Sequence, residues 1–153
     1  MQAYVFKKTA ENLVLFTVDE LKNGEASGKL YHYYQKEPIE YVGLGSLMKE
    51  MDQFYNWLGF PVAGTNERSF RKKNSIPTRP QPKRERVVDR EAMLENTGEI
   101  ATFSVYVQHR ENSTWQGELY WEEKDKCLRF SSELEFLKLM DSALRVMAEK
   151  TTE

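Results

Sequence analysis

The chain has little of what most metal and nucleophile sites are built from. Its 153 residues include one cysteine, Cys127, and two histidines, His32 and His109. A single cysteine excludes an intrachain disulfide and a zinc site made of several cysteines of one chain. The motifs G-x-S-x-G and H-E-x-x-H are also missing. We therefore expect no metal, no cofactor and no enzymatic activity.

Long apolar runs are missing as well. No segment approaches the roughly 20 apolar residues that span a bilayer, and the N-terminal stretch MQAYVFKKTAENLVLF lacks the features of a signal peptide. The net charge of −2 gives no global attraction to nucleic acid or to a membrane surface. These absences predict a cytoplasmic protein with no membrane partner. The 19 aromatic residues argue against wholesale disorder.

One tetrapeptide pattern, Gly-x-Leu-Tyr, occurs at Gly28–Tyr31 and again 89 residues later at Gly117–Tyr120. When the chain is shifted by 89 residues, eight of 47 positions in Asn12–Leu58 and Ala101–Met147 are identical. The shift also preserves the apolar stripe of a half-buried helix, which matches Leu47, Met48, Met51, Phe54, Tyr55 and Leu58 with Phe136, Leu137, Met140, Ala143, Leu144 and Met147. This pattern predicts an internal duplication.

Each repeat is predicted to form three strands followed by a helix. In the second repeat the strands are Ile100–His109, Trp115–Glu122 and Cys127–Phe130, and a capping box at Ser132 starts a helix that reaches about Lys150. In the first repeat Gly59 and Pro61 mark the end of the helix, and an extra strand is expected at residues 2–7. Both glycines of the repeated pattern are expected where a strand begins after a loop.

Two such units bury their apolar faces only by pairing. We therefore expect an α+β fold of two pseudo-symmetric β-β-β-α repeats, with an antiparallel sheet, helices packed on one face and a pseudo-twofold axis. Residues 1–61 form the first repeat, 62–97 a basic, proline-containing linker, and 98–153 the second repeat. Together they are expected to make one compact pseudo-dimeric domain.

The composition changes between the repeats. The stretch Asn66–Arg90 holds nine basic and three acidic residues, a net charge of +6, which leaves about −8 for the rest of the chain. Pro77, Pro80 and Pro82 favour extended backbone, whereas Asp89–Asn96 predicts a short helix. Three interpretations stay open: a solvated linker, an arm for a polyanion, or a segment that docks on the acidic remainder. The predicted phosphate-binding residues are Arg68, Arg71, Lys72, Lys73, Lys83, Arg84 and Arg86.

Tyrosines alternate with the aliphatic residues of the predicted strands. Tyr31, Tyr33, Tyr106 and Tyr120 are therefore expected on the sheet face away from the helices. The arrangement resembles, in architecture only, the Pur-repeat and Whirly families, and this resemblance implies binding of single-stranded nucleic acid to an aromatic sheet face. The residues predicted to stack on bases are Tyr31, Tyr106 and Tyr120. The same tyrosines also suit a core between two sheets or a homodimer contact.

Other functions are kept as alternatives. A protein-interaction adaptor or homo-oligomer would use the aromatic face, with Trp115 and Trp121 as anchors. Arg86-x-x-x-Arg90, followed by the segment from Asn112 to Gly117, resembles the PilZ pattern for cyclic dinucleotides, although threonine stands where that family has serine.

Two aspartates recur at equivalent positions of the repeats. Asp52 and Asp141 would allow acid–base chemistry, but each follows a lysine by three residues and so suits an ordinary surface pair.

A further resemblance covers about the last 50 residues. The segment R-x-N-x-T-W-Q-G from Arg110 and the helix Leu-Met-Asp-Ser-Ala-Leu from Leu139 are similar to a group of short clostridial proteins. This resemblance implies no activity and no site.

Overall fold

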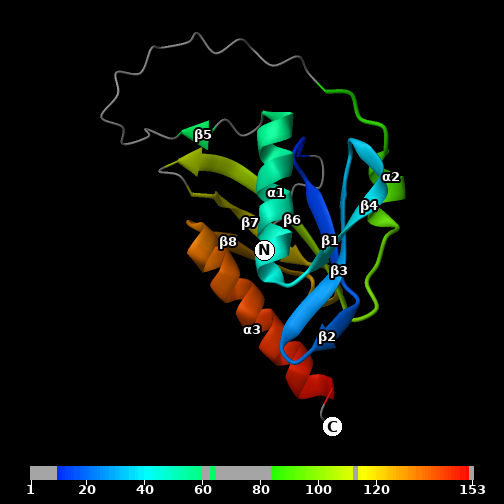
Figure 1. The fold of residues 1–153 in the computed structure, drawn as a ribbon, viewed down its shortest axis with the longest axis vertical. Helices are drawn as coiled ribbons and strands as arrows, with labels where there is room; N and C mark the ends of the chain where they lie inside the picture. Colours follow the sequence, from blue (N-terminus) through cyan, green and yellow to red (C-terminus); the bar gives the residue numbers. More distant parts are fainter. Residues whose placement is uncertain (1–9, 60–62, 65–83, 112–113, 152–153) are drawn as a thin grey trace, which may run out of the picture.

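The computed structural model describes residues 10–59, 63–64, 84–111 and 114–151. The elements are β1 (Val14–Val18), β2 (Glu20–Lys22), β3 (Glu25–His32), β4 (Gln35–Val42), α1 (Leu44–Leu58), β5 (Ala63–Gly64), α2 (Arg90–Leu94), β6 (Ala101–Glu111), β7 (Gln116–Trp121), the 3-10 turn η1 (Glu122–Lys124), β8 (Lys126–Phe130) and α3 (Glu133–Thr151) (Figure 1). The predicted α+β class is confirmed. The strand expected at residues 2–7 lies outside the described residues.

The sheet is an antiparallel meander. Its strands follow the order β4-β3-β1-β6-β7-β8, and β2 continues the line of β1 along β3 after a break at Asp19. The two-residue strand β5 pairs in parallel with the end of β6. None of the helices in the described parts of the chain is long and apolar enough to cross a membrane.

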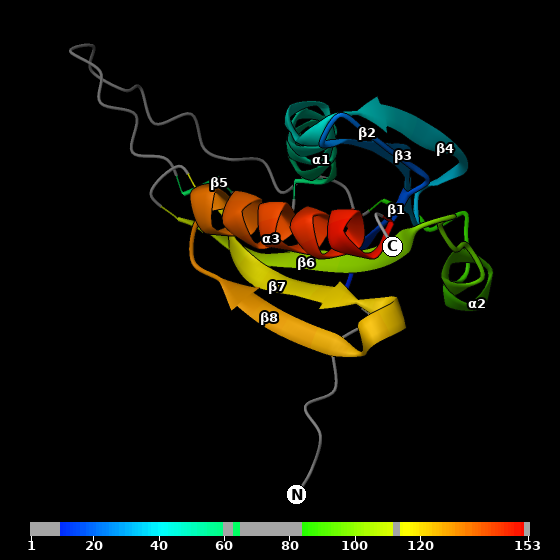
Figure 2. The ribbon, with the colours of Figure 1, turned by 90° about the horizontal axis from the view of Figure 1, so that it is seen from below.

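Both long helices cover the same face of this sheet (Figure 2). The main core joins alternate residues of β1 and β6, such as Phe16 and Phe103, to the apolar stripes of α1 and α3. Met51 of α1 and Met140 of α3 are both 0% exposed. The prediction that the helices pack on one sheet face is therefore confirmed.

The ends of the helices follow the predicted signals. Gly59 has a φ of 72°, and its N–H donates to the carbonyl of Tyr55, so the left-handed position that ends α1 is filled by glycine. At the start of α3 the Ser132 hydroxyl accepts a hydrogen bond of 3.0 Å from the N–H of Glu135. The short helix expected near Asp89 is present as α2, and the Asp89 carboxylate accepts from the N–H of Ala92.

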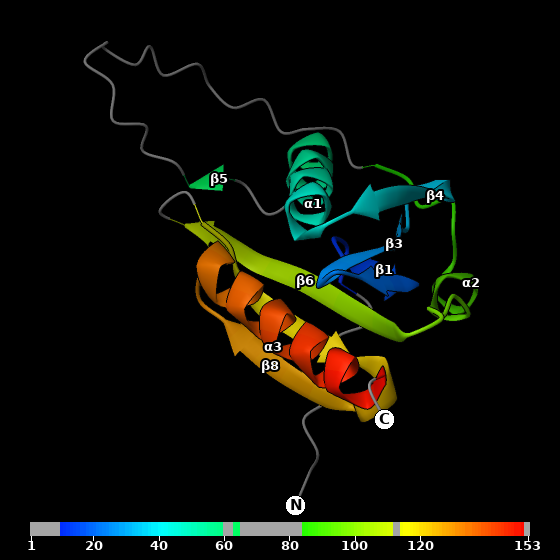
Figure 3. The same cartoon turned by 60° about the horizontal axis from the view of Figure 1, so that its bottom comes forward.

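The strand registers of the two halves correspond under the 89-residue shift. In the first half Phe16 pairs with Leu30, and 89 residues later Val105 pairs with Leu119. The long strand β6 runs between β1, β3, β4 and α1 on one side and β8 and α3 on the other (Figure 3). Each half thus has three main strands and a helix in the same order. Duplication of one unit, with a pseudo-twofold axis, stays a prediction.

The glycines of the repeated pattern are required by close backbone contacts. A Cβ on Gly28 would lie 1.9 Å from the carbonyl oxygen of Thr17, and one on Gly117 would lie 2.1 Å from that of Tyr106. The expectation that both glycines start strands is wrong for Gly28, which lies in the middle of β3. A neighbouring strand approaches each glycine too closely for a side chain, which the sequence pattern could not reveal.

We expect Gly28→Ala and Gly117→Ala each to lower the free energy of unfolding by about 1–3 kcal/mol, because the added methyl group must displace backbone. Urea unfolding measures this change. Gly45→Ala is the matched control, since a Cβ there meets nothing within 4 Å. This control in α1 should be neutral or slightly stabilising. Wild-type stability in Gly28→Ala would contradict the argument.

Candidate binding surfaces

The predicted stacking tyrosines share the sheet face that α1 and α3 leave free. Tyr31 of β3, Tyr106 of β6 and Tyr120 of β7, which we call the tyrosine face, all belong to a second apolar cluster. That cluster also contains Leu15 of β1 and Met93 of α2. The alternation in the sequence therefore placed the three rings on the correct face.

Burial removes part of this face from reach. The Tyr106 ring is 4% exposed, which leaves no face on which a base can stack, while Tyr31 and Tyr120 are half-buried. Tyr33, also expected on this face as a strand residue, instead lies in the β3–β4 turn and is 0% exposed. The tyrosine face is thus mostly a second core, as one of the alternatives to nucleic-acid binding allowed.

The two predicted tryptophan anchors lie on the opposite side of the sheet. Trp115 is 1% exposed and packs edge-on against Tyr55 and Phe136 beneath the helices. Trp121 is half-buried and packs against Phe103 in the same core. The prediction that they anchor an interface on the aromatic face is therefore wrong, because their strand positions point them to the helix side.

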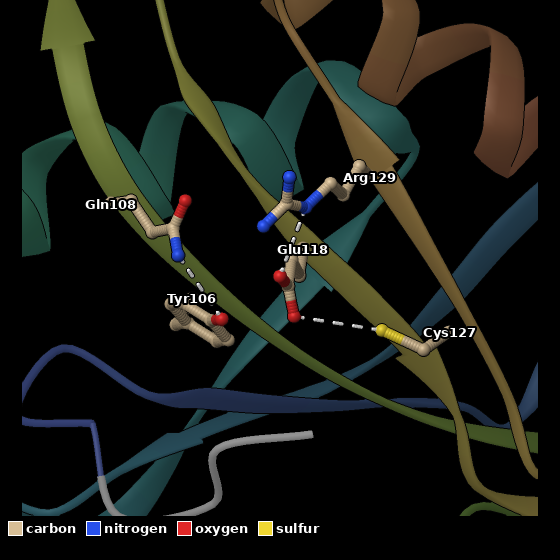
Figure 4. A network of polar contacts seen from close by, with 5 residues as sticks. All are labelled: Tyr106, Gln108, Glu118, Cys127 and Arg129. Atoms are coloured by element: carbon tan, nitrogen blue, oxygen red, sulfur yellow. Dashed lines mark hydrogen bonds and ion pairs between the residues drawn. The ribbon is translucent and has the colours of Figure 1, made fainter. Parts of the chain in front are cut away.

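A buried carboxylate gives the tyrosine face negative charge. Figure 4 shows Glu118 of β7 between Arg129 and Cys127 of β8, with Tyr106 and Gln108 beside it. The Glu118 side chain is 0% exposed and lies 3.3 Å from Nε of Arg129 and 3.7 Å from Sγ of Cys127. A buried anion here repels phosphate and weakens this face as a nucleic-acid platform.

The ionisable groups around Glu118 are poor nucleophiles. Burial, and then the charge of Glu118, raises the pKa of Cys127 to about 11, so the thiol stays protonated at neutral pH. The hydrogen bond to Asp125 is the main reason that the pKa of Tyr120 rises to about 12. Among the described residues no group of three or more His, Cys, Asp or Glu side chains is placed to hold a metal ion.

The two symmetric aspartates have different partners. Asp52 lies 3.8 Å from the largely buried Arg110, which also donates to Asn56 at 2.7 Å. Asp141 pairs with Arg145 one turn along α3 at 3.2 Å. Each aspartate is thus engaged by an arginine that its repeat equivalent does not contact.

Two of the seven predicted phosphate-binding residues lie in the described part of the chain. The guanidinium carbon of Arg84 lies 4.4 Å from the ring centroid of Trp57, and its Nη2 donates to the Trp57 carbonyl at 3.4 Å. Arg86 lies 4.3 Å above the Tyr33 ring. The remaining five, Arg68, Arg71, Lys72, Lys73 and Lys83, are outside the described residues.

Backbone hydrogen bonds fix this end of the basic stretch. The N–H groups of Val87 and Val88 both donate to the Tyr33 carbonyl, at 2.8 and 3.1 Å. Arg84 and Arg86 are therefore held against the first half of the chain, which agrees with the interpretation that this stretch docks on the acidic remainder. Arg86, of the PilZ-like pattern, is used in this contact. Thr114 of that pattern accepts a hydrogen bond from the N–H of Glu133 at the start of α3.

The most exposed aromatic group lies at the end of α1. His32, Tyr34, Phe54 and Trp57, which we call the aromatic corner, pack with ring centroids 4.1–6.4 Å apart. Trp57 is 43% exposed, and the four rings line a groove of about 220 Å³. The sequence analysis missed this cluster. Its signal was a tryptophan outside the apolar stripe of the helix.

Comparison with protein families, with curated proteins and with solved structures finds no match to this chain.

His32 should make the stability of the fold sensitive to acid. Its ring stacks on Phe54 at 4.1 Å, its Nδ1 accepts from the N–H of Tyr34, and burial lowers its pKa to about 4. The folded state thus favours the neutral ring, and that stabilisation is lost as the pH falls from about 6.5 towards 4. The loss amounts to about 3 kcal/mol.

The measurement is urea unfolding of the wild type and His32→Phe at pH 7 and pH 4. The variant keeps the stacked ring but cannot be protonated, so its acid-induced loss should be smaller by about 3 kcal/mol. His109→Phe, which replaces an exposed ring, serves as the control and should lose as much as the wild type. Equal losses in all three proteins would show that His32 is not responsible.

Proposed function

We propose that this protein is a non-catalytic module that binds single-stranded nucleic acid at the aromatic corner. One observation carries the proposal: Arg84 lies on the half-exposed ring of Trp57. This arginine belongs to Asn66–Arg90, the stretch with a net charge of +6. Exposed aromatic and basic groups therefore meet at one place.

This combination suits a nucleic-acid strand. A base stacked on an aromatic ring contributes about 1–3 kcal/mol whatever its sequence, and arginine adds cation–π attraction. The bases would join the stack of Arg84 and Trp57, and the basic residues of the stretch would neutralise phosphates. The stacking role thus moves from the tyrosine face to Trp57 and Tyr34.

The acidic remainder of the chain also has a role in this proposal. Outside the basic stretch the net charge is about −8, and the buried Glu118 adds negative charge to the tyrosine face. Phosphates are repelled from those surfaces and attracted to the basic end. Binding is therefore confined to one side of the first half.

The proposal predicts that a labelled single-stranded oligonucleotide binds the full chain, and that the affinity falls steeply between about 50 and 200 mM salt. Trp57→Ala should weaken binding by about tenfold through lost stacking. Arg84→Gln with Arg86→Gln should reduce the salt dependence by about two charges.

Fluorescence anisotropy measures all three effects. Lys138→Gln removes an exposed cation on α3, remote in sequence from the aromatic corner, and should leave the affinity unchanged. Absence of binding at low salt, or an affinity that does not depend on salt, would exclude this function.

A protein-interaction or homo-oligomeric role is the second candidate, and the open edge of the sheet favours it. In the described residues β8 has no strand on its outer side, and its Leu128 is 42% exposed. At the other edge, β4 carries Pro38 and several charges, which protect it from pairing. Strand pairing through β8 would extend the sheet into a partner.

Light scattering at rising protein concentration tests this second candidate. If β8 pairs between copies, the wild type should dimerise and Leu128→Lys should be monomeric, because a charge on the pairing strand opposes association. A wild-type protein that stays monomeric at every concentration would exclude the homo-oligomeric form.

A further inference from the structure

A second groove adjoins the aromatic corner. It has a volume of about 370 Å³ and lies between the β3–β4 hairpin and residues 87–96. Its walls include Tyr31 and Lys36 from the hairpin and Asp89, Met93 and Asn96 from the segment. The volume is in the range of about 300–1,000 Å³ typical of small-ligand sites.

The groove presents fixed hydrogen-bond acceptors. Nδ2 of Asn96 donates to the carbonyls of Ala92 and Met93, at 3.4 and 3.0 Å, and this orients the amide. Oδ1 of Asp89 accepts from the N–H of Ala92 at 2.7 Å. Within the described parts of the chain, Oδ1 of Asn96 and Oδ2 of Asp89 have no hydrogen-bond partner. A ligand that satisfies these atoms must supply N–H donors.

The other walls suit a flat ligand that carries a negative charge. The Tyr31 ring is half-buried, and Met93 belongs to the same apolar cluster. Lys36 is exposed at the hairpin and has no ion pair among the described residues. A planar group with N–H donors, linked to a phosphate, matches this combination of apolar surface, acceptors and cation.

The two grooves are connected. His32 and Gln35 line both the 370 Å³ groove and the 220 Å³ groove of the aromatic corner. A strand stacked on Trp57 thus has a continuous path past His32 to Tyr31. Successive nucleotides of one strand would occupy the two grooves.

We propose that the 370 Å³ groove selects one nucleobase that carries an amino group, cytosine, adenine or guanine, over thymine or uracil. The base stacks on Tyr31, its amino group donates to Asp89 and Asn96, and Lys36 contacts the adjoining phosphate. Thymine presents a carbonyl oxygen where cytosine presents the amino group, so it places an acceptor against acceptors. This inference rests on the proposed binding of single-stranded nucleic acid.

The test compares the affinities of the full chain for oligonucleotides of dC, dA and dT at one salt concentration. The wild type should bind dC and dA about tenfold more tightly than dT. Asp89→Asn keeps a residue that caps α2 but offers an amide donor, so the preference should fall to near equality. Glu91→Gln, on the same helix and outside the groove lining, should keep the preference.

A second variant blocks the groove. Ala92→Phe fills it from an exposed helical position and should weaken binding of dC by about tenfold while affecting dT little. Ala148→Phe makes the same change on α3 and should have no effect. A wild type that binds dC, dA and dT equally would overturn the base selection and leave the proposed function standing. A wild type that binds none of them would overturn both.

Discussion

The pairing of β1 with β6 is the contact on which the rest of the structure depends. Five residue pairs, from Val14–Val105 to Val18–Ala101, join strands that lie 87 residues apart or nearly so in the chain. Across this joint Phe16 stacks on Phe103 with ring centroids 5.2 Å apart. Without the joint each half would be a three-stranded sheet with one helix, too small to bury its own apolar face. With it, α1 and α3 close a single core that residues of both halves share.

Closing one face so completely decides what the other face offers. The helix side takes the largest apolar groups, Trp115 among them, and the tyrosine side closes partly over Met93 and Leu15. A buried carboxylate, Glu118, remains on that second face with Arg129 as its ion-pair partner. Exposed aromatic surface therefore occurs where the sheet ends, at the β3–β4 turn and the end of α1, and there the basic stretch returns to the fold.

Much of the fold follows from local patterns, and most of the binding surface does not. Alternation and the helical stripe predicted the strands, both long helices and the face of each, because one buried side imposes those periods. The cap at Ser132 and the stop at Gly59 are equally local. Burial of Tyr106 and Trp115 depends on packing between distant segments, so a strand pattern gives the side of a residue but not its exposure. The clash that requires Gly28 arises from the backbone of Thr17, which no local pattern contains.

Equal registers carry different chemistry in the two halves, and this explains why the grooves occur in only one of them. The β3–β4 pair of Lys29 and Glu40 corresponds to the β7–β8 pair of Glu118 and Arg129, with the charges exchanged. The connection after β3 is the turn of Tyr33 and Tyr34, whose carbonyl at Tyr33 anchors Val87 and Val88. The connection after β7 is the 3-10 turn η1, which instead places Glu122 and Glu123 against β6. A hairpin with aromatic side chains and a free carbonyl can receive the basic stretch, whereas a turn of acidic residues already bonded to its own sheet has closed that position. Similar backbones thus yield one half that binds and one half that completes the core.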